Sequence, residues 1–290
     1  MNWRVMGLEG VPLRRGGWIF FLLDYDARFS EELRESLIDS AFEAIDGTLK
    51  KRIRRSRHAE TWAQHLGSGG GPDVYFKVID AAHGAHAMKL LFKGSRVAHV
   101  ARISERLRAD GIGVPEILLL GAEQRGGREI VVTARVEGRN VPRYLRSERE
   151  PLTAKRATLR ALGAEIARLH RAGYLHGDLT PYNIFVTGVD PPQFVFIDHD
   201  RTRRTILSRF ERPRMRNLVQ LGHLDLKTIT NTDRMRVWCG YSATMPTRGR
   251  RAARRRVVQM LQTRIARDRD NNLTQSADAV VPGSMEVREG

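Results

Sequence analysis

The chain has 290 residues, of which 41% are apolar, and 50 basic against 33 acidic side chains give it a formal net charge of +17. This length and apolar content exclude a disordered chain, while the basic excess favours polyanionic partners such as nucleotides, phosphorylated lipid headgroups or nucleic acid. A single cysteine, Cys239, excludes a disulfide framework and a cysteine-based metal site, and it fits a reducing cytoplasm.

The first fifty residues predict a short strand over 18–23 and a helix from Ser30 to about Ala44, where apolar side chains recur at helical spacing. The apolar run 18–23 is too short to span a bilayer and lacks the small-residue cleavage site of a signal peptide. We therefore expect a soluble or peripherally bound protein.

Two strands are predicted next, over 57–66 and 73–80, joined by the glycine-rich turn 67–72. These glycines lie too close to Lys77 for a phosphate-binding loop, which must precede a full intervening strand, so we interpret them as a connecting turn. The turn that covers a nucleotide would then lie near 54–58. There, backbone amides and three guanidiniums are expected to bind phosphate oxygens: those of Arg54, Arg55 and Arg57.

A helix is predicted over 95–109, with Ser95 as its N-cap and Gly111 just past its end. Two apolar strands, GIGVPEILLLGAE and GREIVVTARVEG, follow it, and the second leads into the expected link between two lobes. Adenine is expected to contact backbone groups at the end of that strand, at Thr133, Ala134, Arg135 and Val136.

The octapeptide HGDLTPYN, residues 176–183, follows a long amphipathic helix predicted over 152–172. Its spacing is typical of a kinase catalytic loop, in which Asp178 would accept the proton of an attacking hydroxyl and Asn183 would hold a metal ion. A turn and the apolar run 194–197 then deliver a second carboxylate, Asp198, where a metal-chelating aspartate would lie. The alternative is that these three residues cap a turn, start a strand and face solvent, each of which is common by itself.

The C-terminal part predicts helices over 214–226 and 251–267 and a final segment, 271–290, without helical periodicity. Several stretches together resemble the lipopolysaccharide kinase family, bacterial enzymes that phosphorylate heptose or Kdo sugars of the lipid A core. The resemblance covers most of residues 12–225, and the kinase loop alone is shared with RIO-type atypical kinases and aminoglycoside phosphotransferases. The stretches are RRGGWIFFLLDYDARF, KKRIRRSRHAETW, VYFKVID, FKGSR, ADGIGVPE, YLHGDLTPYNIFV and FIDHDR.

This resemblance implies an α+β, protein-kinase-like bilobal fold that holds ATP and Mg²⁺, with a small β-rich lobe over 1–136, a larger helical lobe over 137–270 and a flexible tail over 271–290. Lys77 matches the strand lysine that pairs with nucleotide phosphates. Asp178 matches the catalytic base, while Asn183 and Asp198 match the metal ligands. His176 matches a histidine that supports the loop and does not react.

Three positions depart from the kinase pattern. The helix glutamate that pairs with the strand lysine is replaced by His99 and Val100, and the nearest acid, Glu105, lies more than a turn away. Gly177 replaces the arginine that receives a phosphorylated activation loop, which predicts constitutive activity. Asp200, two residues after Asp198, could assist magnesium or pair with an arginine such as Arg203, and we expect the second role.

The leading hypothesis is a kinase of a sugar hydroxyl on the lipopolysaccharide core, cytoplasmic or peripheral on the inner membrane. The alternatives are an atypical RIO-like kinase of protein or small molecules and a pseudokinase scaffold. The basic stretch after Asp198 could bind an anionic acceptor, and the run 248–256 could contact an anionic membrane, or both could be solvated faces. Nucleic acid is not favoured, because no aromatic stacking platform is evident. The candidate acceptor-binding residues are Arg201, Arg203 and Arg204.

Overall fold

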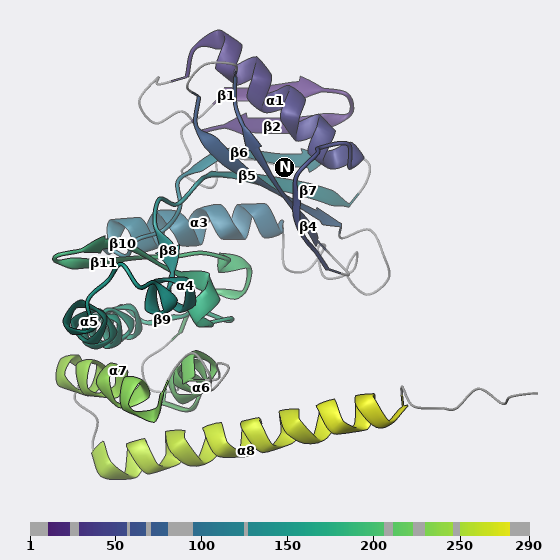
Figure 1. Cartoon of the computed structure of the whole chain (residues 1–290). Coiled ribbons are helices and arrows are strands. Elements are labelled where there is room, and N and C mark those ends of the chain that lie inside the picture. The colour runs from purple at the N-terminus through teal and green to yellow at the C-terminus, as the bar shows by residue number, and fades with distance from the viewer. Residues whose placement is uncertain are drawn as a thin grey trace, which may run out of the picture. The chain divides into compact units, whose positions relative to one another are not determined.

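A computed structural model describes residues 11–23, 29–56, 59–67, 71–80, 95–124, 127–205, 211–222, 230–245 and 250–278. The chain divides into two compact units, shown with their elements in Figure 1. The first comprises Met1–Tyr144, His176–Asp178 and Tyr182–Arg204, and the second Leu145–Leu175, Leu179–Pro181 and Thr205–Gly290. The domain limits expected from the sequence stay a prediction.

An antiparallel sheet of seven strands forms the framework of the first unit, in the order β1-β2-β6-β7-β5-β4-β3. The strands predicted at 18–23, 57–66 and 73–80 are confirmed, and those predicted within 111–123 and 127–138 occupy 117–123 and 128–134. Strands β1 and β3 were not foreseen, and β3 includes Arg54 and Arg55, which were expected to lie in a turn. Their bounds are β1 Val11–Arg15, β2 Trp18–Leu22, β3 Arg52–Arg55, β4 Ala59–His65, β5 Asp73–Asp80, β6 Ile117–Glu123 and β7 Arg128–Ala134.

A helix covers each face of this sheet, and strand alternation decides which side chains meet it. Helix α1 (Glu31–Asp46) packs through Leu37 and Ala41 on one face, in a buried cluster that includes Phe76 of β5. Helix α3 (Arg96–Ala109) packs through Val97 and Val100 on the other face, in a cluster that includes Ile79. Because alternate residues point to opposite faces, Lys77 shares the α3 side with Ile79.

Both helices begin at the residues that the sequence indicated. The side chain of Ser30 accepts a hydrogen bond from the amide of Leu33, and that of Ser95 accepts one from the amide of Ala98, so each satisfies a free amide of the first turn. The start of α3 has a second cap, because Glu129 of β7 is buried and its carboxylate accepts a hydrogen bond from the amide of Arg96. Burial raises the pKa of Glu129, against the hydrogen bonds that lower it.

A second, three-stranded sheet in the first unit carries the predicted hairpin, with the strand order β11-β10-β8. Strand β10 follows the catalytic loop directly, and β11 leads into the segment of Asp198. Short elements flank these strands. The bounds are β8 Arg139–Asn140, α4 Val141–Arg146, η2 Pro181–Asn183, β10 Ile184–Val189, β11 Pro192–Phe196, η3 His199–Arg201 and β12 Arg203–Arg204.

In its described segments, the second unit consists mainly of helices, together with the short strand β9 (Tyr174–Leu175). Helices α5 and α7 approach closely at two glycines: a methyl group on Gly163 would lie 2.0 Å from the carbonyl oxygen of Val237, and one on Gly240 1.8 Å from that of Arg160. The helices are α5 Leu152–Arg171, α6 Glu211–Gly222, α7 Asn231–Thr244 and α8 Arg250–Asp278.

Helix α5 agrees with its predicted range, whereas α6 begins three residues before the predicted start at 214 and ends at Gly222. Helix α7 was not foreseen. Helix α8 extends to Asp278, so the expectation of no helix after 270 is wrong for 271–278, while 279–290 lie outside the described residues. No helix of the described segments is long and apolar enough to cross a membrane.

Candidate active site

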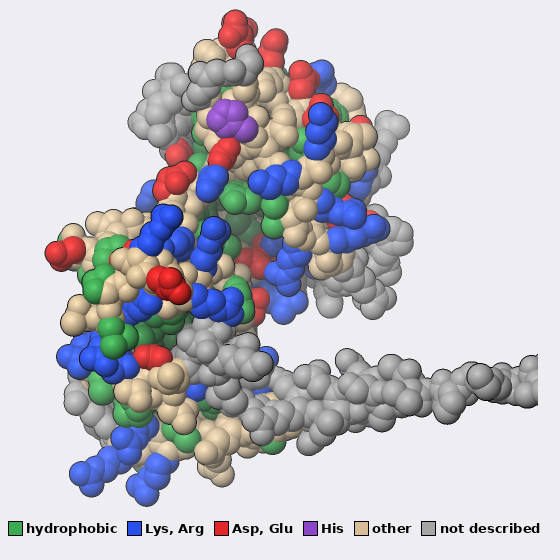
Figure 2. Space-filling view, viewed as in Figure 1, with side chains coloured by type: hydrophobic (Ala, Val, Ile, Leu, Met, Phe, Trp, Pro, Cys, Tyr) green, Lys and Arg blue, Asp and Glu red, His purple; other side chains and the backbone are tan. Residues whose placement is uncertain are grey.

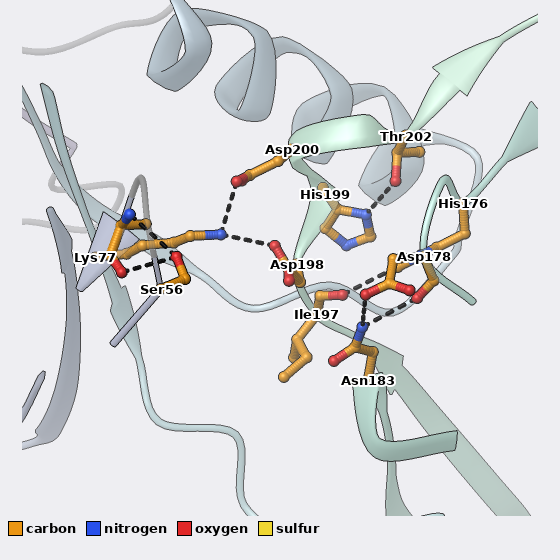
Figure 3. A network of polar contacts seen from close by, with 11 residues as sticks. Ser56, Lys77, His176, Asp178, Asn183, Ile197, Asp198, His199, Asp200 and Thr202 are labelled. Atoms are coloured by element: carbon orange, nitrogen blue, oxygen red, sulfur yellow. Dashed lines mark hydrogen bonds and ion pairs between the residues drawn. The ribbon is translucent and has the colours of Figure 1, made fainter. Parts of the chain in front are cut away.

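Lys77 lies at the centre of the candidate site, on β5. The sheet register aligns it with Thr61 of β4, which in turn pairs with Arg54 of β3, so Arg54 and Lys77 lie on the same face of the sheet. The ammonium group of Lys77 lies 2.7 Å from Oδ1 of Asp198 and 2.7 Å from Oδ2 of Asp200, as Figure 3 shows. All of these residues belong to the first unit.

The opposite charges of this cluster shift the pKa values of Lys77 and Asp198 more than burial does. Burial alone would lower the pKa of Lys77, but the carboxylates of Asp200 and Asp198 outweigh it and raise the pKa. Burial alone would raise the pKa of Asp198, but Lys77 lowers it, with smaller contributions from His176 and Arg54. The lysine is therefore cationic and Asp198 anionic at neutral pH, and Arg54 lies within electrostatic range of Asp198.

Asp198 is held in an unusual backbone conformation. Its φ angle is +65°, and no other non-glycine residue of the described chain has a positive φ. The neighbouring His199 is buried and stabilises this bend, because its Nε2 lies 2.7 Å from the carbonyl oxygen of Phe196 and its Nδ1 lies 3.2 Å from Oγ1 of Thr202. Burial lowers the pKa of His199 to about 3, so the ring is neutral: Nε2–H donates and Nδ1 accepts.

The catalytic loop is fixed from within and against the Asp198 segment. The side-chain nitrogen Nδ2 of Asn183 donates to the carbonyl oxygen of Asp178 at 3.0 Å and to its Oδ2 at 3.2 Å. Nε2 of His176 lies 2.9 Å from the carbonyl oxygen of Ile197 (Figure 3). His176 is buried, and burial lowers its pKa, which favours the supporting role expected of it.

Gly177 explains how closely these two segments approach each other. A methyl group at this position would lie 2.2 Å from Cβ of Arg201 and 2.5 Å from its carbonyl oxygen. No side chain fits there, so the arginine that many kinases carry after the loop histidine is sterically excluded in this chain.

The helix position at which kinases carry a glutamate is occupied differently. His99 of α3 places its Nε2 2.8 Å from the carbonyl oxygen of Thr202, and Glu105 pairs with Arg108 on the same helix. Asp200 instead contacts Lys77, so the prediction that Asp200 pairs with an arginine such as Arg203 is wrong. Only the D-x-D spacing of Asp198 and Asp200 hinted at this pair.

The other predicted nucleotide-binding residues lie around β3 and the end of β7. Arg55 pairs with Glu60 at 2.9 Å, and Arg57 lies outside the described residues. The amide of Ala134 donates to Glu116, and the amide and guanidinium of Arg135 both bind Asp73. Thr133 pairs within the sheet with Tyr75 and Ile117, and Val136 lies two residues after the end of β7. Their contacts with a nucleotide stay a prediction.

The donor set fits a magnesium ion. The amide nitrogen of Asn183 is engaged by Asp178, which leaves its Oδ1 for a cation, and Asp198 supplies a carboxylate. No group of three His, Cys, Asp or Glu side chains in the described segments could hold a metal alone. Mg²⁺ usually binds one or two protein ligands together with substrate phosphates, so this sparse set is the expected one.

The arginines predicted to bind the acceptor are exposed and follow Asp198 closely. Arg201 lies in η3, and Arg203 and Arg204 form β12. The basic run continues through 206–210, which lie outside the described residues, as does Arg248 of the second basic run. The acceptor-binding role of all these arginines stays a prediction.

An antiparallel N-terminal sheet that carries a lysine, a loop with aspartate and asparagine, a following hairpin and a helical C-terminal part together define the protein-kinase-like class, which confirms the expected fold class. The chain belongs to the lipopolysaccharide kinase (Kdo/WaaP) family, whose model matches residues 77–241.

Two curated proteins are also similar to it. KEOPS complex subunit Bud32 of Pyrococcus abyssi is 30% identical over 97 residues, 33% of this chain and 41% of that protein. EKC/KEOPS complex subunit BUD32 of Encephalitozoon cuniculi is 31% identical over 126 residues, 43% of this chain and 58% of that protein. The chain thus spans about half the length of these relatives.

Proposed function

We propose that this protein is an ATP-dependent kinase that phosphorylates a sugar hydroxyl of the lipopolysaccharide core. The observation that carries the proposal is the convergence of Lys77, Asp198, Asn183 and Asp178 in one unit of a chain that belongs to the lipopolysaccharide kinase family. One amine, one base and two oxygen ligands for a metal ion are the groups that phosphoryl transfer requires.

In this proposal Lys77, with Arg54 nearby, binds phosphate oxygens of ATP. Asp198 and Asn183 hold magnesium, which when bound neutralises the charge of the β- and γ-phosphates. The carboxylate of Asp178, oriented by Asn183, accepts the proton of the sugar hydroxyl. The sugar oxygen bonds to the γ-phosphorus, the bond from that phosphorus to the bridging oxygen breaks, and ADP leaves.

The decisive variant is Asp178→Asn, which keeps the shape of the side chain but cannot accept the proton. We expect transfer of label from γ-labelled ATP to core oligosaccharide to fall at least about a hundredfold, with nucleotide binding retained. Asp39→Asn is the matched control, because its ion pair with Arg15 lies on the surface of α1. Undiminished transfer by Asp178→Asn would contradict the assigned role.

A second candidate is an atypical kinase of protein, which the similarity to the two Bud32 proteins favours. The same labelling experiment separates the candidates when core oligosaccharide and a generic protein substrate are offered in parallel. Label in the sugar supports the first candidate, label in the protein supports the second, and label in neither supports a scaffold.

The proposed acceptor is anionic, because sugars of the lipid A core region carry phosphates and carboxylates. The exposed side chains of Arg201, Arg203 and Arg204 suit such groups, since guanidinium binds phosphate and carboxylate through two parallel hydrogen bonds. We also propose that the protein acts at the cytoplasmic surface of the inner membrane, where the acceptor would be embedded.

A further inference from the structure

We propose that Asp200 positions Lys77 for nucleotide binding and so takes the role that a helix glutamate has in other kinases. The inference rests on the proposed function, because it concerns the lysine that binds phosphate. It assigns different roles to the two carboxylates of the D-x-D segment: Asp198 serves the metal and Asp200 serves the lysine.

The first step is the geometry of the lysine. Its ammonium group donates to both carboxylates at the same distance, 2.7 Å, so Lys77 is held from two sides. A carboxylate that turns to a metal ion can no longer be the main anchor of a lysine. Since Asp198 lies two residues after the end of β11, at the place expected for the chelating residue, Asp200 is the partner that remains when the nucleotide binds.

The second step is that α3 offers no substitute. Glu105 is the sole acid within α3, and it pairs with Arg108. The residue at the expected position, His99, is engaged by the carbonyl oxygen of Thr202. Helix α3 therefore holds the segment that carries Asp200 and leaves the contact with the lysine to Asp200 itself.

The third step is that Asp200 stands on a rigid support. It lies in the short helix η3, between the buried His199 and the fully buried Thr202, and the hydrogen bonds of His199 and His99 both reach Thr202. The side chain of Asp200 is only 24% exposed. A carboxylate on such a support restricts the long, flexible side chain of a lysine to one geometry.

The test measures where Lys77 lies and which residue binds the metal. Lys77 is acetylated with acetic anhydride in the full-length protein, with and without ADP and magnesium, and its modification is quantified by mass spectrometry. The affinity for fluorescent ADP is measured in magnesium and in chelator. The variants are Asp200→Asn, Asp200→Glu and Asp198→Asn, with Asp39→Asn as a control, because Asp39 is exposed and pairs with Arg15, outside the cluster.

We expect ADP to protect Lys77 in the wild-type protein, and Asp200→Asn to reduce that protection about tenfold, as the loss of one charge-assisted hydrogen bond implies. Asp200→Glu should restore part of it. The ratio of ADP affinities with and without magnesium should stay unchanged in Asp200→Asn and approach one in Asp198→Asn.

Two results would overturn the inference: full protection of Lys77 in Asp200→Asn, or loss of the magnesium effect in that variant, which would make Asp200 a metal ligand. If the wild-type protein neither binds ADP nor protects Lys77, the proposed function itself fails. Thermal unfolding checks the folding of each variant, and Asp200→Ser replaces Asp200→Asn if the latter does not fold.

Discussion

Gly177 sets how closely the catalytic loop and the Asp198 segment can approach. The backbone of Arg201 lies against it at distances that no side chain tolerates. The glycine therefore replaces the arginine through which loop phosphorylation controls many kinases. It also lets the loop of Asp178 lie close to the segment of Asp198. Substitution should separate the segments.

We expect Gly177→Ala to lower phosphoryl transfer at least about tenfold while it costs about 1–3 kcal/mol of unfolding free energy, the usual range for an overpacked site. Gly188→Ala is the matched control, because its methyl group would lie 3.1 Å from the side chain of Gln193 and 3.1 Å from the carbonyl oxygen of Pro191, a much smaller overlap than at Gly177. Kinetics and urea unfolding of both variants give the comparison, and equal kinetics for the two would refute the explanation.

At the scale of elements, a buried histidine joins three helices of the second unit. His170 of α5 lies 3.0 Å from the hydroxyl of Tyr241 on α7 and 3.3 Å from Oδ1 of Asn217 on α6. Burial lowers the pKa of His170 from 6.5 to about 3. His170 thus holds the three helices together in its neutral form.

This contact makes stability depend on pH. Between pH 6.5 and about 3 the unfolded chain binds a proton at His170 and the folded chain does not, so the unfolding free energy rises with pH in this window and is lost as the pH falls. The slope for this residue is about 1.4 kcal/mol per pH unit. Urea unfolding across the window should show a shallower slope for His170→Phe than for the wild-type protein, and an equal slope for the two would contradict this explanation.

Local signals allowed most elements to be predicted. Serine caps and apolar periodicity marked α1 and α3, and β-rich alternation marked β5. Helix α7 was missed because its apolar residues form no single stripe, although Thr230 and Asp233 form a capping box that could have indicated its start. Strand β1, VPLRR, is too short and polar to stand out before its partner is known.

In the candidate site, too, local spacing indicated some residues, whereas one contact depends on the fold. Asp178, Asn183 and Asp198 lie within a short stretch, so their spacing alone indicated a common role. Lys77 is 121 positions from Asp198 and 123 positions from Asp200 in the sequence. Which acid the lysine contacts therefore depends on how the chain folds. Arginines surround Asp200 in the sequence and favoured an arginine as its partner, whereas in the fold its carboxylate binds Lys77.

At the scale of the whole molecule, the formal net charge is +17, and Figure 2 shows many basic side chains on the face in view. Helix α8 contributes a dense group, because Ala253 is buried while Arg251, Arg254 and Arg255 are exposed. Such a helix can lie against an anionic surface without inserting into it.

We expect the protein to cosediment with phosphatidylglycerol vesicles and not with phosphatidylcholine vesicles, and added salt to weaken this binding. Replacing Arg251, Arg254 and Arg255 with glutamine should reduce it at least about tenfold, since each basic residue contributes about 1 kcal/mol near such a surface. The control removes the same charge elsewhere, at the exposed residues Arg143, Arg146 and Arg149. Equal losses in both variants would show that total charge, and not α8, governs binding.

Helix α3 is fastened at two places: Glu129 of the sheet caps its first turn, and His99 ties it to the segment after Asp198. Kinases that respond to signals swing the corresponding helix between an idle and a working position. A helix held by these two contacts cannot make that movement without breaking them. We therefore expect the rate of the proposed phosphoryl transfer to depend on the concentration of the acceptor and not on a regulatory signal.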